Sequence, residues 1–333
     1  MVSKLAAFLL FSYIFSLSFA QDVWPIKCPV TGTYTNWSET RCPSTQTCSP
    51  NGFSAGGGYG CCPFVNGVSC GSGFACCPSG STCTLISGSG YSTVYECTGA
   101  NPPTTSKCPC KPGMPNPPST TLKNVLVIGD SLSIGFTPPV AANLSDIALV
   151  QHAPWDVSDG GAEESAYFQQ CLDNWLHSPS GVSFYPDLIY FNSGMHNLSP
   201  TGTPGNGTVP GQSGNATEYS SQMLDVMTRL VAFSKASGGK TRLMYGLTTA
   251  YLCDANIDAV ITQRLNSAAS SIAASLGIWI VDAHAPIVTR CGAAPVSSCF
   301  GETGCFCPHC PPAYNWLATT VIAPAIRAIL NDS

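Results

Sequence analysis

The run Val125–Ile128, followed by Gly129, Asp130 and Ser131, constrains the fold more than any other stretch of the chain. An unbroken apolar run that ends in turn residues is typical of a parallel strand buried on both faces. A residue directly after such a strand lies at the carboxyl edge of the sheet, where open α/β folds bind ligands. We expect Ser131 at that edge, at a helix N-terminus that favours negative charge. Ser131 is then a candidate nucleophile, or it caps the helix together with Asp130.

From Lys123 onward, segments typical of strands alternate with segments typical of helices. The expected strands are 125–128, 147–151, 187–192, 241–247 and 278–281, and the expected helices are 163–176, 218–235, 257–276 and 312–330. Such alternation indicates the α/β class, with a parallel sheet covered by helices on both faces.

The first third of the chain has a different composition. Ten of the 19 cysteines lie between Cys28 and Cys97, among Gly, Ser and Pro and with almost no periodic apolar pattern. Such a segment cannot bury enough core to fold alone, so disulfides must stabilise it. A proline-rich segment follows, and its Cys108 and Cys110 can pair with either neighbouring part. We expect a cysteine-rich module over 21–100, an extended linker over 101–122 and the α/β domain over 123–333.

Residues 1–20 have the pattern of a secretory signal peptide, with Lys4 before an apolar stretch and Ser18-Phe19-Ala20 as the cleavage site. The cysteine content agrees with an oxidising compartment. Six Asn-x-Ser/Thr sequons are compatible with N-glycosylation: Asn36, Asn143, Asn197, Asn206, Asn215 and Asn331. No later apolar stretch reaches the roughly 20 residues of a membrane helix. We expect a secreted, extracellular glycoprotein with no membrane anchor.

The charge of the chain argues against a nucleic-acid partner. Charged residues make up 9% of the sequence and the net charge is −5. Nucleic-acid binding needs clustered Lys and Arg, which this sequence does not offer.

The spacing of the N-terminal cysteines carries a family resemblance. Cys42-x5-Cys48-x12-Cys61-Cys62-Pro63 is followed by Cys70-x5-Cys76-Cys77-Pro78-Ser79-Gly80-x2-Cys83, and this pattern resembles the granulins. The resemblance implies stacked β-hairpins joined by ladder-like disulfides. Cys70 is single where the family has a pair, and Phe74-Ala75 replaces the family's His before a Cys pair. We interpret the module as a binding or spacer element, with a polysaccharide or a cell-surface ligand as its candidate partner.

Four blocks of the second domain resemble the SGNH (GDSL) hydrolases in order and spacing. Gly129-Asp130-Ser131-Leu132-Ser133 matches the first block and Asp159-Gly160-Gly161 the second. The third block is Asn192-Ser193-Gly194-Met195-His196-Asn197, and the fourth is Cys307-Pro308-His309 before the last expected helix. The resemblance implies a three-layer α/β/α, flavodoxin-like fold with Ser131 as nucleophile and no cofactor or metal.

A serine hydroxyl needs a neighbouring base, and His309 suits that role because imidazole titrates near neutral pH. Donors must also stabilise the tetrahedral oxyanion. The resemblance implies the amides of Ser131 and Gly161 for this role. His196 stands where the family has its oxyanion Asn, so we assign it the third donor, with Asn192 or Asn197 as alternatives. A glycan on Asn197 would block the site, so we expect Asn197 to be unmodified.

The acid of the expected triad is absent from its usual position. Phe306 stands three residues before His309, where the family has Asp. A backbone carbonyl can orient the imidazole instead, or Glu302 or Asp282 can approach it. Asp130 is expected to accept backbone N–H bonds around the Ser131 turn.

Two alternatives compete with this site. His284, after Asp282-Ala283, is a rival base, although it lacks the final helix that the fourth block requires. Cysteines 299, 305, 307 and 310 around His309 can be interpreted as a zinc site, or as disulfides that hold the loop. In a secreted chain we favour disulfides.

The sequence therefore predicts a secreted serine esterase that hydrolyses acyl esters, most simply acetyl esters of a carbohydrate or a small molecule, through an acyl-enzyme. One alternative is a recognition protein that has kept the scaffold and lost catalysis. The other is an acyltransferase.

Overall fold

The protein is described from a computed structural model. The structure describes residues 26–27, 41–42, 44–51, 58–71, 75–87, 94–99, 104–105, 109–111, 113, 116–154, 161–176, 184–197, 216–252, 255–292, 297–301 and 309–332. Residues 1–20, which we expect to be a signal peptide, lie outside this described part, as do Asp159, Gly160, Glu302 and residues 305–307.

The α/β domain is built on a five-stranded parallel sheet in the order β11-β10-β12-β13-β14. The strands are β10 (Lys123–Ile128), β11 (Ala148–Ala153), β12 (Leu188–Phe191), β13 (Arg242–Gly246) and β14 (Trp279–Val281). Counted along the chain, this is the order 2-1-3-4-5 of flavodoxin-like folds. The predicted α/β class is confirmed, and the five predicted strands lie within two residues of the observed bounds.

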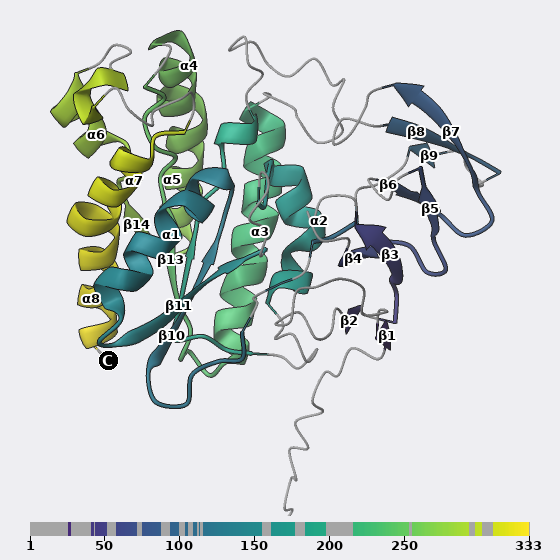
Figure 1. Cartoon of the computed structure of the whole chain (residues 1–333), viewed down its shortest axis with the longest axis horizontal. Helices are drawn as coiled ribbons and strands as arrows, with labels where there is room; N and C mark the ends of the chain where they lie inside the picture. The colour runs from purple at the N-terminus through teal and green to yellow at the C-terminus, as the bar shows by residue number, and fades with distance from the viewer. Residues whose placement is uncertain are drawn as a thin grey trace, which may run out of the picture.

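Helices cover both faces of the sheet (Figure 1). The helices α1 (Ser131–Leu144), α7 (Pro311–Leu317) and α8 (Ala323–Asn331) pack together on one face, and α2 (Ser165–Trp175), α3 (Ala216–Ala236) and α5 (Ser267–Ser275) on the other. The expected helix 257–276 is α4 (Ala255–Val260), a π-helical segment (Ile261–Asn266) and α5. A second π-helical segment (Ala318–Ile322) joins α7 to α8. The short α6 (Ala285–Cys291) is not predicted by the sequence.

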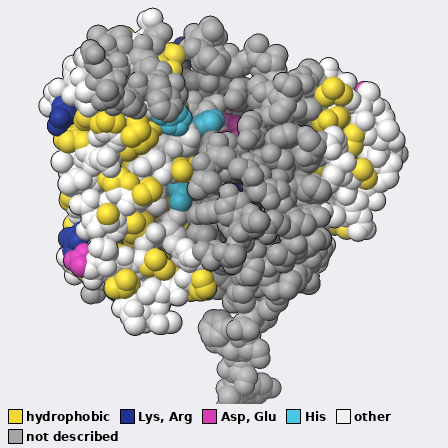
Figure 2. Space-filling model, viewed as in Figure 1, with side chains coloured by type: hydrophobic (Ala, Val, Ile, Leu, Met, Phe, Trp, Pro, Cys, Tyr) yellow, Lys and Arg dark blue, Asp and Glu magenta, His cyan; other side chains and the backbone are white. Residues whose placement is uncertain are grey.

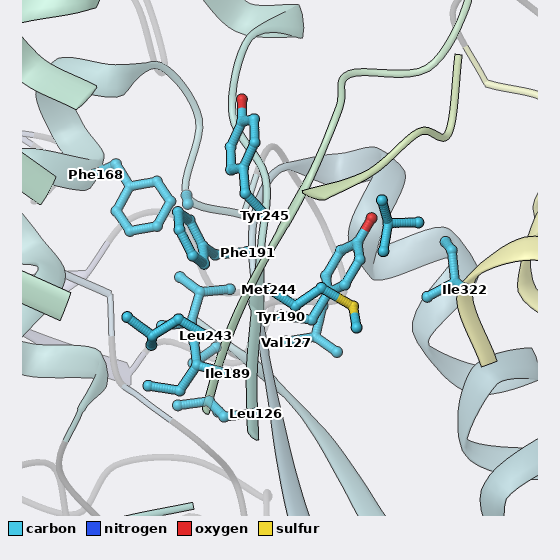
Figure 3. Packing of buried hydrophobic residues seen from close by; sticks show 14 of the residues in the cluster. Leu126, Val127, Phe168, Ile189, Tyr190, Phe191, Leu243, Met244, Tyr245 and Ile322 are labelled. Carbon is cyan, nitrogen blue, oxygen red and sulfur yellow. The ribbon is translucent and has the colours of Figure 1, made fainter. Parts of the chain in front are cut away.

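The side chains of the central strands alternate between the two faces (Figure 3). On β12, Phe191 points toward Phe168 of α2, whereas Tyr190 points to the face on which Ile322 lies. Neither Tyr190 nor Phe191 is more than 1% exposed. Burial on both faces explains why these strands are unbroken apolar runs, since neither face has a solvent side for polar residues.

The cysteine-rich part consists of short antiparallel pairings. The strands are β1 (Ile26–Lys27), β2 (Arg41–Cys42), β3 (Thr47–Asn51), β4 (Gly58–Cys62), β5 (Val68–Cys70), β6 (Ala75–Cys77), β7 (Thr82–Ser87), β8 (Val94–Thr98) and β9 (Thr104–Thr105). Disulfides join successive hairpins: Cys42–Cys61, Cys62–Cys76, Cys70–Cys83 and Cys77–Cys97. This is the ladder-like arrangement that the granulin resemblance implies.

The segment expected to be an extended linker is anchored where the structure describes it. Cys110 forms a disulfide with Cys171 of α2, which answers the open question of which part Cys110 joins. Cys110 and Cys61 also exchange two backbone hydrogen bonds of 3.0 and 2.9 Å. The segment therefore contacts the cysteine-rich part and the α/β domain together. Within the described part of the chain, no helix is long and apolar enough to cross a membrane.

We expect Phe191→Ala to lower the free energy of unfolding by about 3–5 kcal/mol, because it opens a cavity in the closed centre of the sheet. Leu224→Ala is the control, since Leu224 is 48% exposed on α3, and a surface change of this kind costs within about 0.5 kcal/mol. Urea denaturation of the oxidised protein measures both values. Equal losses in the two variants would contradict the packing described here.

Candidate active site

Ser131 is the first residue of α1 and lies at the carboxyl edge of β10. Asp130 caps this helix, and its Oδ1 accepts a hydrogen bond of 3.1 Å from the Leu132 N–H, as the sequence predicts. The Asn192 side chain donates to the same oxygen at 3.3 Å. Asp130 is fully buried, and burial raises the pKa of its carboxyl above the ordinary value, although the nearby His196 and these hydrogen bonds oppose the shift.

The structure brings His309 to Ser131 across 178 residues of sequence. His309 Nε2 lies 3.4 Å from Ser131 Oγ, at the point where the chain enters α7. This distance is at the long end for a hydrogen bond, as is common where such pairs tighten only around a substrate. Figure 2 shows histidine side chains next to hydrophobic ones on one face of the molecule.

Tyr314 contacts the other nitrogen of the His309 ring. Its hydroxyl lies 2.8 Å from His309 Nδ1, and the two rings meet edge to face. Burial raises the pKa of the Tyr314 phenol, so the hydroxyl is neutral. Tyr314 is not predicted by the sequence pattern, because the family's acid stands before His309, whereas Tyr314 follows His309 by five residues.

Gly135 of α1 makes room for this tyrosine. A Cβ at position 135 would lie 2.4 Å from the Tyr314 ring. The glycine is four residues after Ser131, so the same helix that carries the hydroxyl also accepts the ring behind His309. Gly135 is the residue of the sequence that bears on Tyr314. Its role can be recognised only once α1 and α7 are known to be in contact.

The His309 ring is half-buried, and this burial lowers the pKa of its imidazole below the ordinary 6.5. The nearby His196 acts in the same direction, while the Asp130 carboxylate opposes it. At neutral pH the ring is therefore uncharged and able to accept a proton.

Gly161 lies against the Ser131 turn. It forms a bridge with Asp130, and the next amide, of Ala162, donates a 2.8 Å hydrogen bond to the Gly129 carbonyl. Its φ of +63° and a Cβ position only 2.5 Å from the Gly129 carbonyl oxygen explain why only glycine fits. Gly161, the described residue of the second block, therefore lies against the first block.

His196 reaches the same edge from the neighbouring strand. It lies in a 3₁₀ turn (Met195–Asn197) after β12 and is partly exposed. Since β12 pairs in parallel with β10, this turn lies at the same edge of the sheet as Ser131. Ser131, His309, Gly161 and His196 therefore gather at one edge of the sheet.

The two asparagines weighed against His196 have other partners. The Asn197 side chain is fully buried, accepts from the Ser165 N–H at 3.1 Å and donates to Ser165 Oγ at 2.7 Å. Asn197 therefore anchors the start of α2, and its amide nitrogen has no access for a glycan. Asn192 is buried and holds Asp130.

The rival base and acid belong to a separate cluster. His284 Nε2 lies 3.0 Å from Asp258 Oδ1. Asp282 Oδ1 accepts from the amides of His284 and Ala285 at 2.8 and 2.9 Å, so it caps the start of α6. His309 faces Ser131 and Tyr314 instead.

The cysteines near His309 are engaged in disulfides where the structure describes them. Cys299 pairs with Cys291, and Cys310 is also disulfide-bonded. Neither sulfur is available as a thiolate ligand, which removes two of the four ligands of the zinc alternative.

His152, behind the Ser131 turn, is a buried structural residue. Its Nε2 lies 2.6 Å from Ser133 Oγ and its Nδ1 2.8 Å from the Pro154 carbonyl. Burial lowers the pKa of His152 to about 4, so the ring stays neutral.

Comparison with known proteins gives one family match and several similar solved structures. The granulin family model matches residues 47–89. No curated protein matches the chain by sequence. Solved structures similar to the chain include an acetyl xylan esterase, at 14% identity over 50% of this chain and 80% of that chain, with a TM-score of 0.38.

Two further structures are a member of the lipolytic protein G-D-S-L family from Veillonella parvula and a family two carbohydrate esterase from Clostridium thermocellum in complex with cellohexaose. The first is 15% identical over 59% of this chain and 94% of that chain, with a TM-score of 0.38. The second is 12% identical over 69% and 68%, with a TM-score of 0.41. At these values the likeness carries no argument about activity, which has to be argued from the residues of the site.

We expect the His309 imidazole to titrate below pH 6.5 in the folded protein, because burial disfavours its charged form. A histidine-ring NMR titration measures the midpoint, and His309→Gln identifies the resonance. In the urea-unfolded protein the same ring should return to the ordinary value. A midpoint at or above 6.5 in the folded state would contradict the described environment.

Proposed function

We propose that the protein is a carboxylic ester hydrolase with Ser131 as nucleophile and His309 as base. The observation that carries the proposal is the 3.4 Å contact between Ser131 Oγ and His309 Nε2, on a ring that burial keeps neutral. A hydroxyl next to a neutral imidazole is the minimal arrangement for nucleophilic catalysis at neutral pH.

In the acylation half-reaction, Ser131 Oγ attacks the carbonyl carbon of the ester and its proton passes to His309 Nε2. The carbonyl oxygen becomes an oxyanion, for which the amides of Ser131 and Gly161 and the ring N–H of His196 are the proposed donors. The C–O bond to the alcohol then breaks, and His309 returns the proton to the leaving oxygen. The product of this half-reaction is an ester on Ser131.

In the deacylation half-reaction, water attacks the same carbonyl carbon and gives a proton to His309. Collapse of the second tetrahedral intermediate releases the carboxylic acid and returns the proton to Ser131 Oγ. Water enters on the open side of His309, which is only half-buried.

Tyr314 takes the place of the triad acid in this proposal. When His309 is protonated, both of its nitrogens donate, so the Tyr314 oxygen 2.8 Å from Nδ1 accepts. A neutral phenol orients the ring and stabilises the imidazolium less than a carboxylate does, because it carries no charge.

For the substrate we propose short acyl esters, acetyl above all, on a carbohydrate or a small polar alcohol. The resemblance of the four sequence blocks to SGNH hydrolases supports this class. A secretory signal peptide over residues 1–20 and the disulfides among the described residues support an extracellular location. We also propose that the cysteine-rich module ends at residue 100 and that the α/β domain begins at residue 123.

The Ser131–His309 contact favours catalysis over a recognition protein that has lost activity. We expect purified protein to hydrolyse p-nitrophenyl acetate, and Ser131→Ala and His309→Ala each to lower kcat by at least about 10³-fold. Fluorophosphonate should label the wild type and not Ser131→Ala. His284→Ala is the matched control and should keep the wild-type rate.

Equal rates in all four proteins would contradict the proposal. A product assay with a sugar acceptor separates hydrolysis from acyl transfer, since transfer yields the acylated sugar in place of free acid.

We expect Tyr314→Phe to lower kcat between about 10-fold and 100-fold, because a hydrogen bond to a charged group contributes about 1.5–3 kcal/mol. KM should stay unchanged, since the phenol acts only through His309. Tyr185→Phe is the control, because Tyr185 is 43% exposed and packs on Phe233. A wild-type kcat in Tyr314→Phe would show that the hydroxyl has no catalytic consequence.

A further inference from the structure

Lys111 is a buried cation that the proposed reaction does not use. It lies in the proline-rich segment before the α/β domain, and its side chain is fully enclosed. An enclosed ammonium is costly unless it is paired and hydrogen-bonded. The position of Lys111 therefore depends on the groups that its Nζ contacts.

Those groups belong to the loop that carries Gly161. Lys111 Nζ donates to the Gly161 carbonyl at 3.0 Å and to Glu163 Oε1 at 2.6 Å. Burial, with the neighbouring Glu163, raises the pKa of the adjacent Glu164 to about 8. Glu164 is therefore mostly uncharged at neutral pH, and Glu163 supplies the negative charge that Lys111 needs.

The contact with Gly161 fixes one of its two flanking peptide planes. This is the peptide plane between Gly161 and Ala162. Its carbonyl group, that of Gly161, accepts from Lys111, and its N–H, that of Ala162, donates to the Gly129 carbonyl at 2.8 Å. The plane is thus held from both ends. With this plane fixed, two backbone rotations at Gly161, ψ and φ, set the direction of its own N–H, and its φ is +63°.

The backbone of Lys111 is held as firmly as its side chain. The Tyr167 hydroxyl accepts from the Lys111 N–H at 2.8 Å and donates to the Pro109 carbonyl at 2.8 Å. The Trp175 indole N–H donates to the Lys111 carbonyl at 3.0 Å. The preceding residue, Cys110, is bonded to Cys171, so all three anchors lie on α2.

We propose that Lys111 is a positioning residue for the oxyanion donor Gly161, so that a segment outside the α/β domain sets the geometry of the active site. This inference rests on the proposed ester hydrolysis. Lys111 does not touch substrate; it acts by fixing the Gly161 peptide against the Ser131 turn. The cysteine-rich part of the chain, which pairs with Cys110 through Cys61, thereby supports the site mechanically.

The test is Lys111→Met in the full, oxidised chain, since methionine fills a similar volume without the charge. We expect kcat for p-nitrophenyl acetate to fall between about 10-fold and 100-fold with KM unchanged, because a misplaced oxyanion donor weakens only the transition state. The rate of fluorophosphonate labelling should fall in parallel, because the phosphoryl oxygen of that adduct occupies the oxyanion position.

Lys123→Met is the matched control. Lys123 is a half-exposed lysine of β10 whose Nζ lies 3.4 Å from Asp187, and its loss should leave kcat and labelling unchanged. Glu163→Gln should cause a smaller loss than Lys111→Met, since the contact with the Gly161 carbonyl remains.

A folded Lys111→Met variant with wild-type kcat would overturn the inference. A loss of kcat that disappears when both proteins are assayed equally far below their melting temperatures would also overturn it, because the loss would then reflect stability alone. If Lys111→Met fails to fold, Tyr167→Phe decides. It removes the hydroxyl that holds Pro109 and Lys111 and should lower kcat; an unchanged kcat would overturn the inference. A wild-type rate that is independent of Ser131 would instead reject the proposed hydrolysis itself.

Discussion

The parallel pairing of β10 with both β11 and β12 is the constraint on which the site depends. Because the three strands run the same way, the residues that follow them meet at one edge of the sheet. The chain leaves this edge through Ser131 after β10, returns to it at Gly161 after β11, and reaches it again at His196 after β12. The order 2-1-3-4-5 puts the change of winding direction at β10, which is where open α/β sheets bind ligands.

Burial controls the protonation states at this edge. It raises the pKa of the Asp130 carboxyl and lowers that of the His309 imidazole, and both shifts oppose charge in the enclosed site. The Asp130 carboxylate also acts on His309, since it favours the protonated imidazole. Tyr314 is neutral and supplies no negative charge. Among the described residues, the Asp130 carboxylate is the negative group that favours the protonated His309 ring. Asp130 therefore contributes to the electrostatics of the pair while serving as the helix cap.

The elements that the sequence predicts well are those with strong local signals. The run Val125–Ile128 could be identified as a buried strand because both of its faces are covered, and Asp130 as a cap because its acceptor role is local. Tyr314 and Lys111 carry no comparable signal, since their partners lie on other elements and an exposed tyrosine or lysine has the same sequence pattern. The disulfide between Cys110 and Cys171 could not be predicted from the sequence either, because cysteine spacing alone permits many connectivities.

The anchoring of residues 109–111 changes how the cysteine-rich part relates to the α/β domain. A flexible proline-rich linker would let the two parts move independently, and the module could then act only by binding something else. Here Cys61 is joined to Cys42 by a disulfide and to Cys110 by two hydrogen bonds, and Cys110 is joined to Cys171. A continuous path therefore runs from the hairpins to α2 and, through Lys111, to the Gly161 loop. Removing the N-terminal residues through 118 would also delete Lys111. A loss of activity in such a truncation would therefore reflect the lost Lys111–Gly161 contact as much as any loss of ligand binding by the cysteine-rich part. Only point substitutions separate the two effects, because they leave the disulfide path intact.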